Sequence, residues 1–221
     1  LGSLARKIGA NMLFEGIDSV HQLQFAWKNG GRYYQGKYLA TAQADTVSRE
    51  LLKDHFKEKF QQFITTEKRL LEEKYNELKN LQNMLETAIG HINPTSDNIE
   101  QLLLLAEELN DCSFRIYICN EDGFQLSPNI MQVDKKWTVQ EDAVNKNWSW
   151  RPYFLKTIIK MRNDQSGVFS DMYSDIETGE MMRTFSIPLN DREYLFIDIS
   201  YDYLFKYNIF NSISSIPIKP V

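Results

Sequence analysis

TVSRELLKDHFKEKFQQFITTEKRLLEEKYNELKNLQNMLETAIGHI, residues 46–92, divides this chain into three parts. It contains no proline, and its only glycine, Gly90, comes near its end. Apolar side chains recur in it at spacings of three, four or sums of these, which is the period of one helix face. They are Leu52, Phe56, Phe60, Phe63, Leu70, Leu71, Tyr75, Leu78, Leu81, Leu85 and Ala88.

The stretch therefore predicts a connecting helix of roughly 65 to 70 Å, at about 1.5 Å per residue. A helix of this length cannot be covered by one small domain. It is expected to be a spacer between domains, a dimer seam, or both. The alternative is two shorter helices that break around ITTEKR, residues 64–69.

Helix and strand patterns alternate in the segment before it, residues 1–45. NMLF, residues 11–14, is a short apolar run, and the helical pattern after it opens with two N-cap candidates, Asp18 and Ser19. Such alternation is typical of a parallel sheet with helices outside it, but two units cannot close one. We expect the segment either to complete a barrel whose other strands are absent from this chain or to pack on another, unseen part. Since the chain starts at Leu1 rather than Met, it is expected to be the interior of a longer protein.

Residues 93–221 predict an α+β domain with an antiparallel sheet. A turn cluster, NPTSDN, precedes the helical run at 98–111, with Ser96 or Asp97 as its expected cap. A β-hairpin is expected between SFRIYICN, residues 113–120, and FQLSPNI, residues 124–130. Its turn would be formed by Glu121, Asp122 and Gly123. A helix after Pro152 and three further strands complete five strands in a meander-like order.

The composition argues against a nucleic-acid-binding protein, a disulfide-stabilised protein, a zinc protein and a membrane-spanning protein. The net charge of −5 and the pI near 5.3 give no basic surface for a nucleic-acid duplex. Two cysteines, Cys112 and Cys119, are too few for a disulfide framework or a zinc site, so we expect reduced thiols in a cytoplasmic protein. No run of 18 apolar residues and no signal peptide are visible, so no membrane span is expected.

The stretch LARKIGANMLFEGIDSVHQLQFAWKNGGRYYQGKYLA, residues 4–40, resembles the C-terminal end of EAL domains, the cyclic-di-GMP phosphodiesterase family. That family ends with a strand running into Glu-Gly-Val-Glu, a helix with a Gln-Leu pair, and then Gln-Gly-Tyr. The matching residues are Glu15, Gly16, Ile17, Asp18, Gln22, Leu23, Gln35 and Gly36. The long helix and small domain that follow resemble the YkuI type, in which an EAL-associated, PAS-like or Cache-like signalling domain hangs from a connecting helix.

The resemblance implies a division into three parts. Residues 1–45 would be the C-terminal portion of an EAL (β/α)8 barrel, incomplete in this chain. Residues 46–92 would be the connecting helix, and residues 93–221 the PAS/Cache-like domain. It also implies cyclic-di-GMP as the ligand and a homodimer as the assembly.

The chemistry implied is hydrolysis of a phosphodiester by water, with Mg²⁺ or Mn²⁺ held by carboxylates that mostly precede Leu1. Glu15 corresponds to the carboxylate that orients the catalytic water, and Gln35 to an amide near that water or the nucleotide. The plainer alternatives are a solvated carboxylate at a strand end for Glu15 and a turn-shaping residue for Gln35. Because most of the site is absent, this chain alone is not expected to be active.

Two departures from the family pattern leave the activity of the full-length parent open. Asp18 stands in place of the second glutamate, and Lys37 in place of the aromatic residue after Gln-Gly. The parent is therefore expected to be either a phosphodiesterase or a catalytically weak or inactive cyclic-di-GMP receptor or scaffold. A third alternative takes residues 46–221 as a self-standing dimeric sensor unrelated to the nucleotide.

The third segment carries a candidate ligand site. NWSWRPYF, residues 147–154, resembles the start of a helix in Cache sensors, where an arginine and nearby tyrosines hold a small carboxylate. Arg151, Tyr153 and Tyr173 are the candidates, and Asp198 is expected to face the same cavity and suit a ligand amine. The alternative is that the aromatic residues are core and Arg151 pairs with a local carboxylate.

Overall fold

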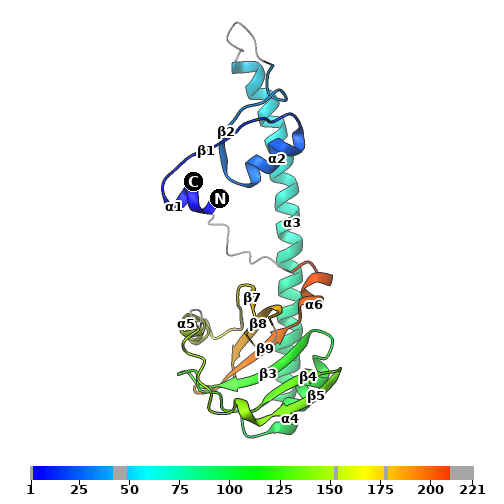
Figure 1. The fold of residues 1–221 in the computed structure, drawn as a ribbon. Helices are drawn as coiled ribbons and strands as arrows, with labels where there is room; N and C mark the ends of the chain where they lie inside the picture. The colour runs from blue at the N-terminus through cyan, green and yellow to red at the C-terminus, as the bar shows by residue number, and fades with distance from the viewer. Residues whose placement is uncertain (1, 42–48, 152–153, 177–178, 210–221) are drawn as a thin grey trace. The chain divides into compact units, whose positions relative to one another are not determined.

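The computed structural model describes residues 2–41, 49–151, 154–176 and 179–209 (Figure 1). The chain forms two compact units, Leu1–Leu71 and Glu72–Val221. No helix in the described ranges combines the length and the apolar character that a membrane span requires.

The first unit contains α1 (Gly2–Lys7), β1 (Met12–Phe14), α2 (Val20–Lys28), β2 (Gly31–Tyr34) and the start of α3 (Arg49–Ile92). The two strands pair in parallel, with Phe14 opposite Tyr34, which confirms the expected parallel arrangement. Ser19 is the N-cap of α2, because its hydroxyl accepts a hydrogen bond from the amide of Gln22. Apolar residues of the loop after β1, of α2 and of α3 pack the core of this unit: Ile17, Leu23, Ala26 and Phe63.

The long helix is continuous. α3 has 44 residues, and residues 64–69 are helical throughout, so the alternative of two shorter helices is wrong. α3 contributes apolar residues to both units. Phe63 lies in the first core, while Leu81 and Leu85 lie in the core of the second unit.

The second unit is built on a seven-stranded sheet with the order β5-β4-β3-β9-β8-β6, and β7 pairs with β8. All its pairings are antiparallel. The strands are β3 (Ser113–Cys119), β4 (Asn129–Val133), β5 (Lys136–Gln140), β6 (Val168–Phe169), β7 (Tyr173–Ser174), β8 (Met181–Pro188) and β9 (Tyr194–Ile199). The helices are α4 (Ile99–Glu108), η1 (Glu141–Ala143), α5 (Phe154–Asp164) and α6 (Tyr201–Lys206).

This sheet corrects one sequence expectation and confirms another. The order is not meander-like, because the last strand, β9, lies beside the first, β3, in the centre of the sheet. The expected hairpin is present, since Cys119 pairs with Gln125, the amide of Asn120 donates to the carbonyl of Phe124, and β3 pairs antiparallel with β4. Its ladder is interrupted before Asn129, because the hydroxyl of Ser127 accepts from the amide of Ile118 and Pro128 has no amide to donate.

The cap of α4 is also different from the expected residue. Asn98, and not Ser96 or Asp97, accepts the hydrogen bond from the amide of Gln101. The hydroxyl of Ser96 instead donates to the carboxylate of Glu193, in the turn between β8 and β9. This bond ties the connection between α3 and α4 to the sheet.

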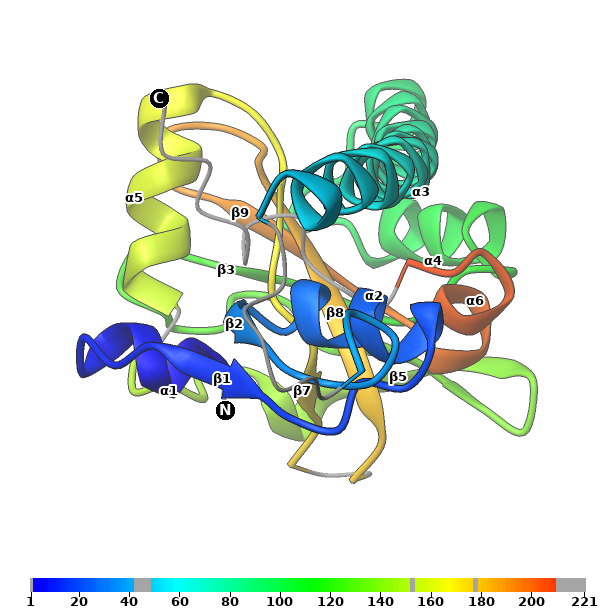
Figure 2. The ribbon, with the colours of Figure 1, turned by 90° about the horizontal axis from the view of Figure 1, so that it is seen from above.

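The sheet has two chemically different faces, because side chains alternate along each strand. In β9, Leu195, Ile197 and Ile199 join the core that contains α3 and α4. Tyr194 and Phe196 point to the other face and pack with α5. Figure 2 shows α5 well apart from α3 and α4. The helix that enters from the first unit therefore packs on one face, and the other face is left for α5.

The two cysteines lie in different cores and are free thiols. Cys112 belongs to the core on the α3 face, and Cys119 belongs to the core on the α5 face. Burial raises the pKa of Cys112 to about 12, and burial also raises the pKa of Cys119 far above that of a free thiol. Since a thiolate is the reactive form, both side chains are chemically protected.

We therefore expect neither cysteine to be alkylated by iodoacetamide in the native chain at pH 8, because both thiols stay protonated and covered. In denaturant at the same pH, both should be modified, which intact mass spectrometry measures directly. Rapid modification of either residue in the native chain would contradict the burial.

Candidate functional site

Glu15 and Gln35 follow the carboxyl ends of two adjacent parallel strands, β1 and β2. The backbone joins the two exits closely. The amide of Gln35 donates to the carbonyl of Phe14 at 2.8 Å, and the amide of Ile17 donates to the carbonyl of Gln35 at 3.0 Å. Both predicted residues are exposed at this edge, which is where α/β barrels place their sites.

Gly36 shows why the Gln-Gly pair ends the strand. A Cβ atom at Gly36 would lie 2.0 Å from the carbonyl oxygen of Ile17 and 2.2 Å from its amide nitrogen. The glycine therefore allows the loop after β2 to lie directly on the loop after β1. The amide of Tyr38 donates to the same carbonyl at 3.0 Å and closes the contact.

Asp18 links the same two loops. Its carboxylate accepts from the amide of Lys37 at 3.4 Å, and its own amide donates to the Gln22 side chain at 2.7 Å. With the Ser19 hydroxyl accepting from the Gln22 amide, this is close to a capping box, in which a cap residue and a residue three positions later bond reciprocally. Gln22 is thus a positioning residue of the loop that carries Glu15, a role that the sequence pattern did not suggest.

A metal site is not complete in these residues. Within the described ranges, no group of three or more His, Cys, Asp and Glu side chains is placed to hold a metal ion. Glu15 offers a single carboxylate of the kind that Mg²⁺ and Mn²⁺ prefer. The described residues therefore do not form the metal centre that the resemblance implies.

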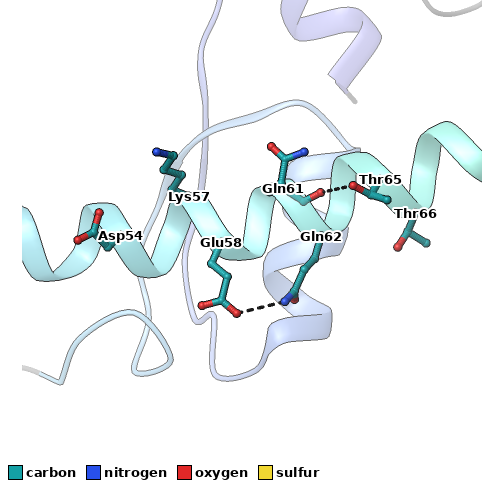
Figure 3. Close-up of a pocket in the computed structure, with 7 residues that line it drawn as sticks. All are labelled: Asp54, Lys57, Glu58, Gln61, Gln62, Thr65 and Thr66. Carbon is teal, nitrogen blue, oxygen red and sulfur yellow. Dashed lines mark hydrogen bonds between the residues drawn. The ribbon is translucent and has the colours of Figure 1, made fainter.

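A hollow on α3 of about 580 Å³ is not a candidate site either (Figure 3). Its described lining comes entirely from one helix face, and several of the side chains bond within the helix. Thr65 donates to the carbonyl of Gln61, and Gln62 donates to Glu58. The hollow has no second wall among the described residues. The lining is Asp54, Lys57, Glu58, Gln61, Gln62, Thr65 and Thr66.

The second unit holds two small cavities, each of about 10 Å³, which is room for about one water molecule. Tyr117 and Arg151 line both cavities. The first is also lined by Phe154, Thr157, Ser170, Tyr173, Thr184, Ser186 and Phe196. The second is also lined by Arg115, Gln125, Asn129 and Trp148.

Two tryptophan rings lie beside the Arg151 guanidinium. The guanidinium carbon lies 4.4 Å from the centre of the Trp148 ring and 5.9 Å from that of Trp150. Trp148 is fixed in turn by donating to Gln125 at 2.8 Å, and Gln125 donates to Asn129 at 2.9 Å. A buried amide network therefore holds the ring on which Arg151 rests.

Arg115 is the feature that sequence reasoning missed. Its Nε donates to Asp198 at 2.7 Å, and its terminal nitrogen donates to Asp175 at 2.9 Å, with all three side chains at most 5% exposed. Burial lowers the pKa of Arg115, but the two carboxylates outweigh it and raise the pKa, so the guanidinium stays charged. The sequence feature that could have indicated this buried ion-pair network is the arginine inside the apolar run SFRIYIC.

The predicted ligand residues are distributed as follows. Arg151 and Tyr173 line the first cavity. Asp198 is absent from the described lining of both cavities, which corrects its expected position, because it bonds to Arg115 and to the Thr184 hydroxyl. The Tyr173 hydroxyl lies 2.6 Å from the Thr184 hydroxyl, which donates to Asp198. Tyr153 lies outside the described residues.

Comparisons with known proteins identify the family to which this chain is similar. Residues 46–210 match the model of the EAL-domain associated signalling protein domain. The uncharacterized EAL-domain containing protein YkuI of Bacillus subtilis (strain 168) is 50% identical over 205 residues, which are 92% of this chain and 50% of that protein. The crystal structure of B. subtilis YkuI, with an EAL domain and in complex with c-di-GMP and calcium, matches with a TM-score of 0.83 and 48% identity. That match covers 95% of this chain and 53% of the YkuI chain. The chain thus spans about half the length of the relatives it matches.

Proposed function

This chain belongs to the family of EAL-domain associated signalling domains of the YkuI type, and from that membership we propose that it is the C-terminal part of a cytoplasmic cyclic-di-GMP signalling protein. In the full-length parent, we propose a metal-dependent cyclic-di-GMP phosphodiesterase controlled by the domain at 93–221. The observation that carries this proposal is the meeting of Glu15 and Gln35 at the carboxyl ends of β1 and β2.

Each of the two residues has a role in this proposal. Glu15, exposed at the strand end, orients the attacking water by accepting a hydrogen bond from it. Gln35 offers an amide that donates and accepts at once, which suits the same water or a nucleotide oxygen. A divalent cation, when bound, stabilises the phosphoryl charge and lowers the pKa of water. Its ligands belong mostly to the part of the parent before Leu1.

The relative's crystal structure supports the choice of ligand. That protein is in complex with c-di-GMP and calcium, and calcium shares with Mg²⁺ and Mn²⁺ a preference for oxygen ligands. A cation held between the protein and the nucleotide would also neutralise the phosphate charge beside a chain whose net charge is −5.

The regulation proposed is geometric. A small ligand at Arg151 acts on one face of the sheet, and α3 packs on the other face of the same strands through Leu81 and Leu85. Movement of the strands would shift α3, and α3 would shift the loops that carry Glu15. The helix is also the proposed seam of a homodimer. Coupling of this kind requires two states whose balance both sites alter.

The test of the catalytic proposal is turnover of cyclic-di-GMP to the linear dinucleotide by the full-length parent with Mg²⁺ or Mn²⁺. Glu15→Gln is expected to lower kcat by about 10²- to 10⁴-fold, with nucleotide affinity kept, because a general-base contribution of that size is lost. Glu58→Gln, on the outer face of α3, is the matched control and should leave turnover unchanged.

The receptor alternative is favoured by one specific observation, the shorter Asp18 carboxylate, which bonds to the Lys37 amide at 3.4 Å. Saturable binding of cyclic-di-GMP without product by the wild-type parent would support it and reject the phosphodiesterase. Absence of any binding heat would reject both and leave a sensor unrelated to the nucleotide. For the regulatory part, unchanged turnover, affinity and dimerisation after Arg151→Ala and after deletion of 112–221 would reject the coupling.

A further inference from the structure

The strand β5 forms one edge of the seven-stranded sheet (Figure 1). Among the described residues it pairs with β4 alone. In an antiparallel pair, the backbone groups of alternate residues point toward the neighbouring strand. The two-residue turn before β5 directs Lys136, Thr138 and Gln140 toward β4, so the N–H and C=O groups of Trp137 and Val139 point outward. Within the described ranges, neither outward residue makes a backbone–backbone hydrogen bond outside the sheet.

The two edges of this sheet differ in how they are protected. At the opposite edge, β6 consists of only two residues, Val168 and Phe169, and so short an edge offers little to a second strand. β5 has five residues, and its only charged residue, Lys136, stands at its end. Neither a proline nor a register shift interrupts it. The devices with which natural sheets prevent pairing at an edge are therefore missing from the centre of β5.

This edge is complementary to itself in one antiparallel register. When Thr138 of two copies lie opposite each other, Trp137 of each copy meets Val139 of the other, and the outward backbone groups form about four hydrogen bonds. Trp137 packs against the core shared with α3 and α4, and Val139 lies on the same face of the strand. The valine side chain is 40% exposed in the single chain. An indole ring opposite this valine is a favourable cross-strand pair.

The charges at the two ends of β5 agree with the same register. Lys135 and Lys136 stand at the start of the strand, Glu141 follows its end, and all three are exposed. A two-fold axis at Thr138 brings the basic start of one copy beside the acidic end of the other. Opposite charges across two strands are stabilising and fix their register, whereas a parallel arrangement would bring like charges together.

We propose that β5 pairs edge to edge with β5 of a second copy of this chain, in an antiparallel arrangement with Thr138 at the two-fold axis. The sheets of the two signalling domains then form one continuous sheet. This interface is separate from the α3 seam described above, and it does not depend on nucleotide binding.

Cysteine substitution in the 221-residue chain tests the register directly. In the proposed pairing, the Cα atoms of the two Thr138 residues lie about 4.5–5.5 Å apart, which suits a disulfide. The two Lys136 residues lie more than about 13 Å apart, which does not. With oxidised glutathione, Thr138→Cys is expected to form a linked dimer at least about 10-fold faster than Lys136→Cys. Non-reducing electrophoresis measures both rates, and the native cysteines are buried.

Hydrogen exchange gives a second readout that needs no variant. The outward amides of Trp137 and Val139 are expected to exchange at least about 10-fold more slowly as the protein concentration rises, while the inward amide of Thr138 is protected throughout. In the Thr138→Cys background, Val139→Pro should abolish the cross-link, because it removes an outward donor and leaves the ladder to β4 intact. Val139→Ala, which keeps the amide, is the control and should still cross-link.

Three results would overturn the inference. They are equal cross-linking rates at positions 136 and 138, exchange at Trp137 and Val139 that does not depend on concentration, and a cross-link that survives Val139→Pro. A dimer that persists without these signals would be joined elsewhere, as through α3, and would reject the β5 interface while leaving the proposed function untouched.

Discussion

Replacing Arg115 by alanine is expected to lower the free energy of unfolding of the second unit by about 3–5 kcal/mol or more. The side chain is 4% exposed and pairs with two carboxylates that are themselves buried. Its removal leaves both charges in the interior without a cation, and an uncompensated buried charge is among the largest known causes of destabilisation. Urea unfolding followed by the fluorescence of Trp137, Trp148 and Trp150 measures the change.

The matched control is Arg162→Ala. Arg162 also pairs with a carboxylate, Glu121, at 3.0 Å, but both side chains are largely exposed, at 65% and 48%. Exposed pairs contribute about 0–1 kcal/mol, so little change is expected. A second variant separates the loss of stability caused by unpaired charge from the loss caused by missing packing. In Arg115→Met, the further change Asp198→Asn should recover part of the lost stability, because it removes one unpaired charge. Equal small losses for Arg115→Ala and Arg162→Ala would contradict the buried network.

Gly36→Ala is expected to destabilise the first unit by about 3 kcal/mol or more, at or above the upper range for overpacked sites. The added methyl group would lie 2.0 Å from the backbone oxygen of Ile17, and a backbone atom cannot turn away as a side chain can. The loops that carry Glu15 and Gln35 would separate. Hydrogen exchange at the amides of Ile17 and Gln35, which bond across this contact, reports the loss.

Gly90→Ala is the control, because it is expected to raise stability where Gly36→Ala lowers it. Gly90 is helical, and no neighbour lies within 4 Å of the position that its Cβ would take. Alanine there should stabilise α3 by about 0.5–1 kcal/mol, because glycine costs that much more in a helix. If Gly36→Ala were as well tolerated as Gly90→Ala, the close approach of the two loops would be refuted.

The sequence was sufficient where a structure depends on neighbours along the chain. The period of α3, the cap at Ser19 and the parallel pairing of the first two strands all follow from local pattern, while Glu15 and Gln35 were singled out by the resemblance to EAL domains. β5 was not predicted, since its turn is Asp134-Lys135 rather than an Asn-Gly pair. Both turn residues take positive φ angles, 49° and 63°, which these residue types rarely adopt.

The Arg115 network was out of reach for a different reason. Its partners, Asp175 and Asp198, are 60 and 83 positions away in the chain, and only the central pairing of β3 with β9 brings Asp198 beside Arg115. Hydrophobic periodicity reports which face a residue takes, but not which distant residue it meets there. The expectation for Asp198 failed on this point, because its partner is a protein guanidinium.

The alternation along β9 has an evolutionary consequence. Positions 195, 197 and 199 pack toward α3, while 194, 196 and 198 face the opposite way. Substitutions at the second set can change the face that packs with α5 without altering the surface that packs against α3. A one-residue insertion would exchange the two sets, placing a carboxylate against the helix and leucine in the cavity. The α5 face can therefore vary by point substitution while the α3 face stays intact, whereas a change in the length of β9 would alter both faces at once.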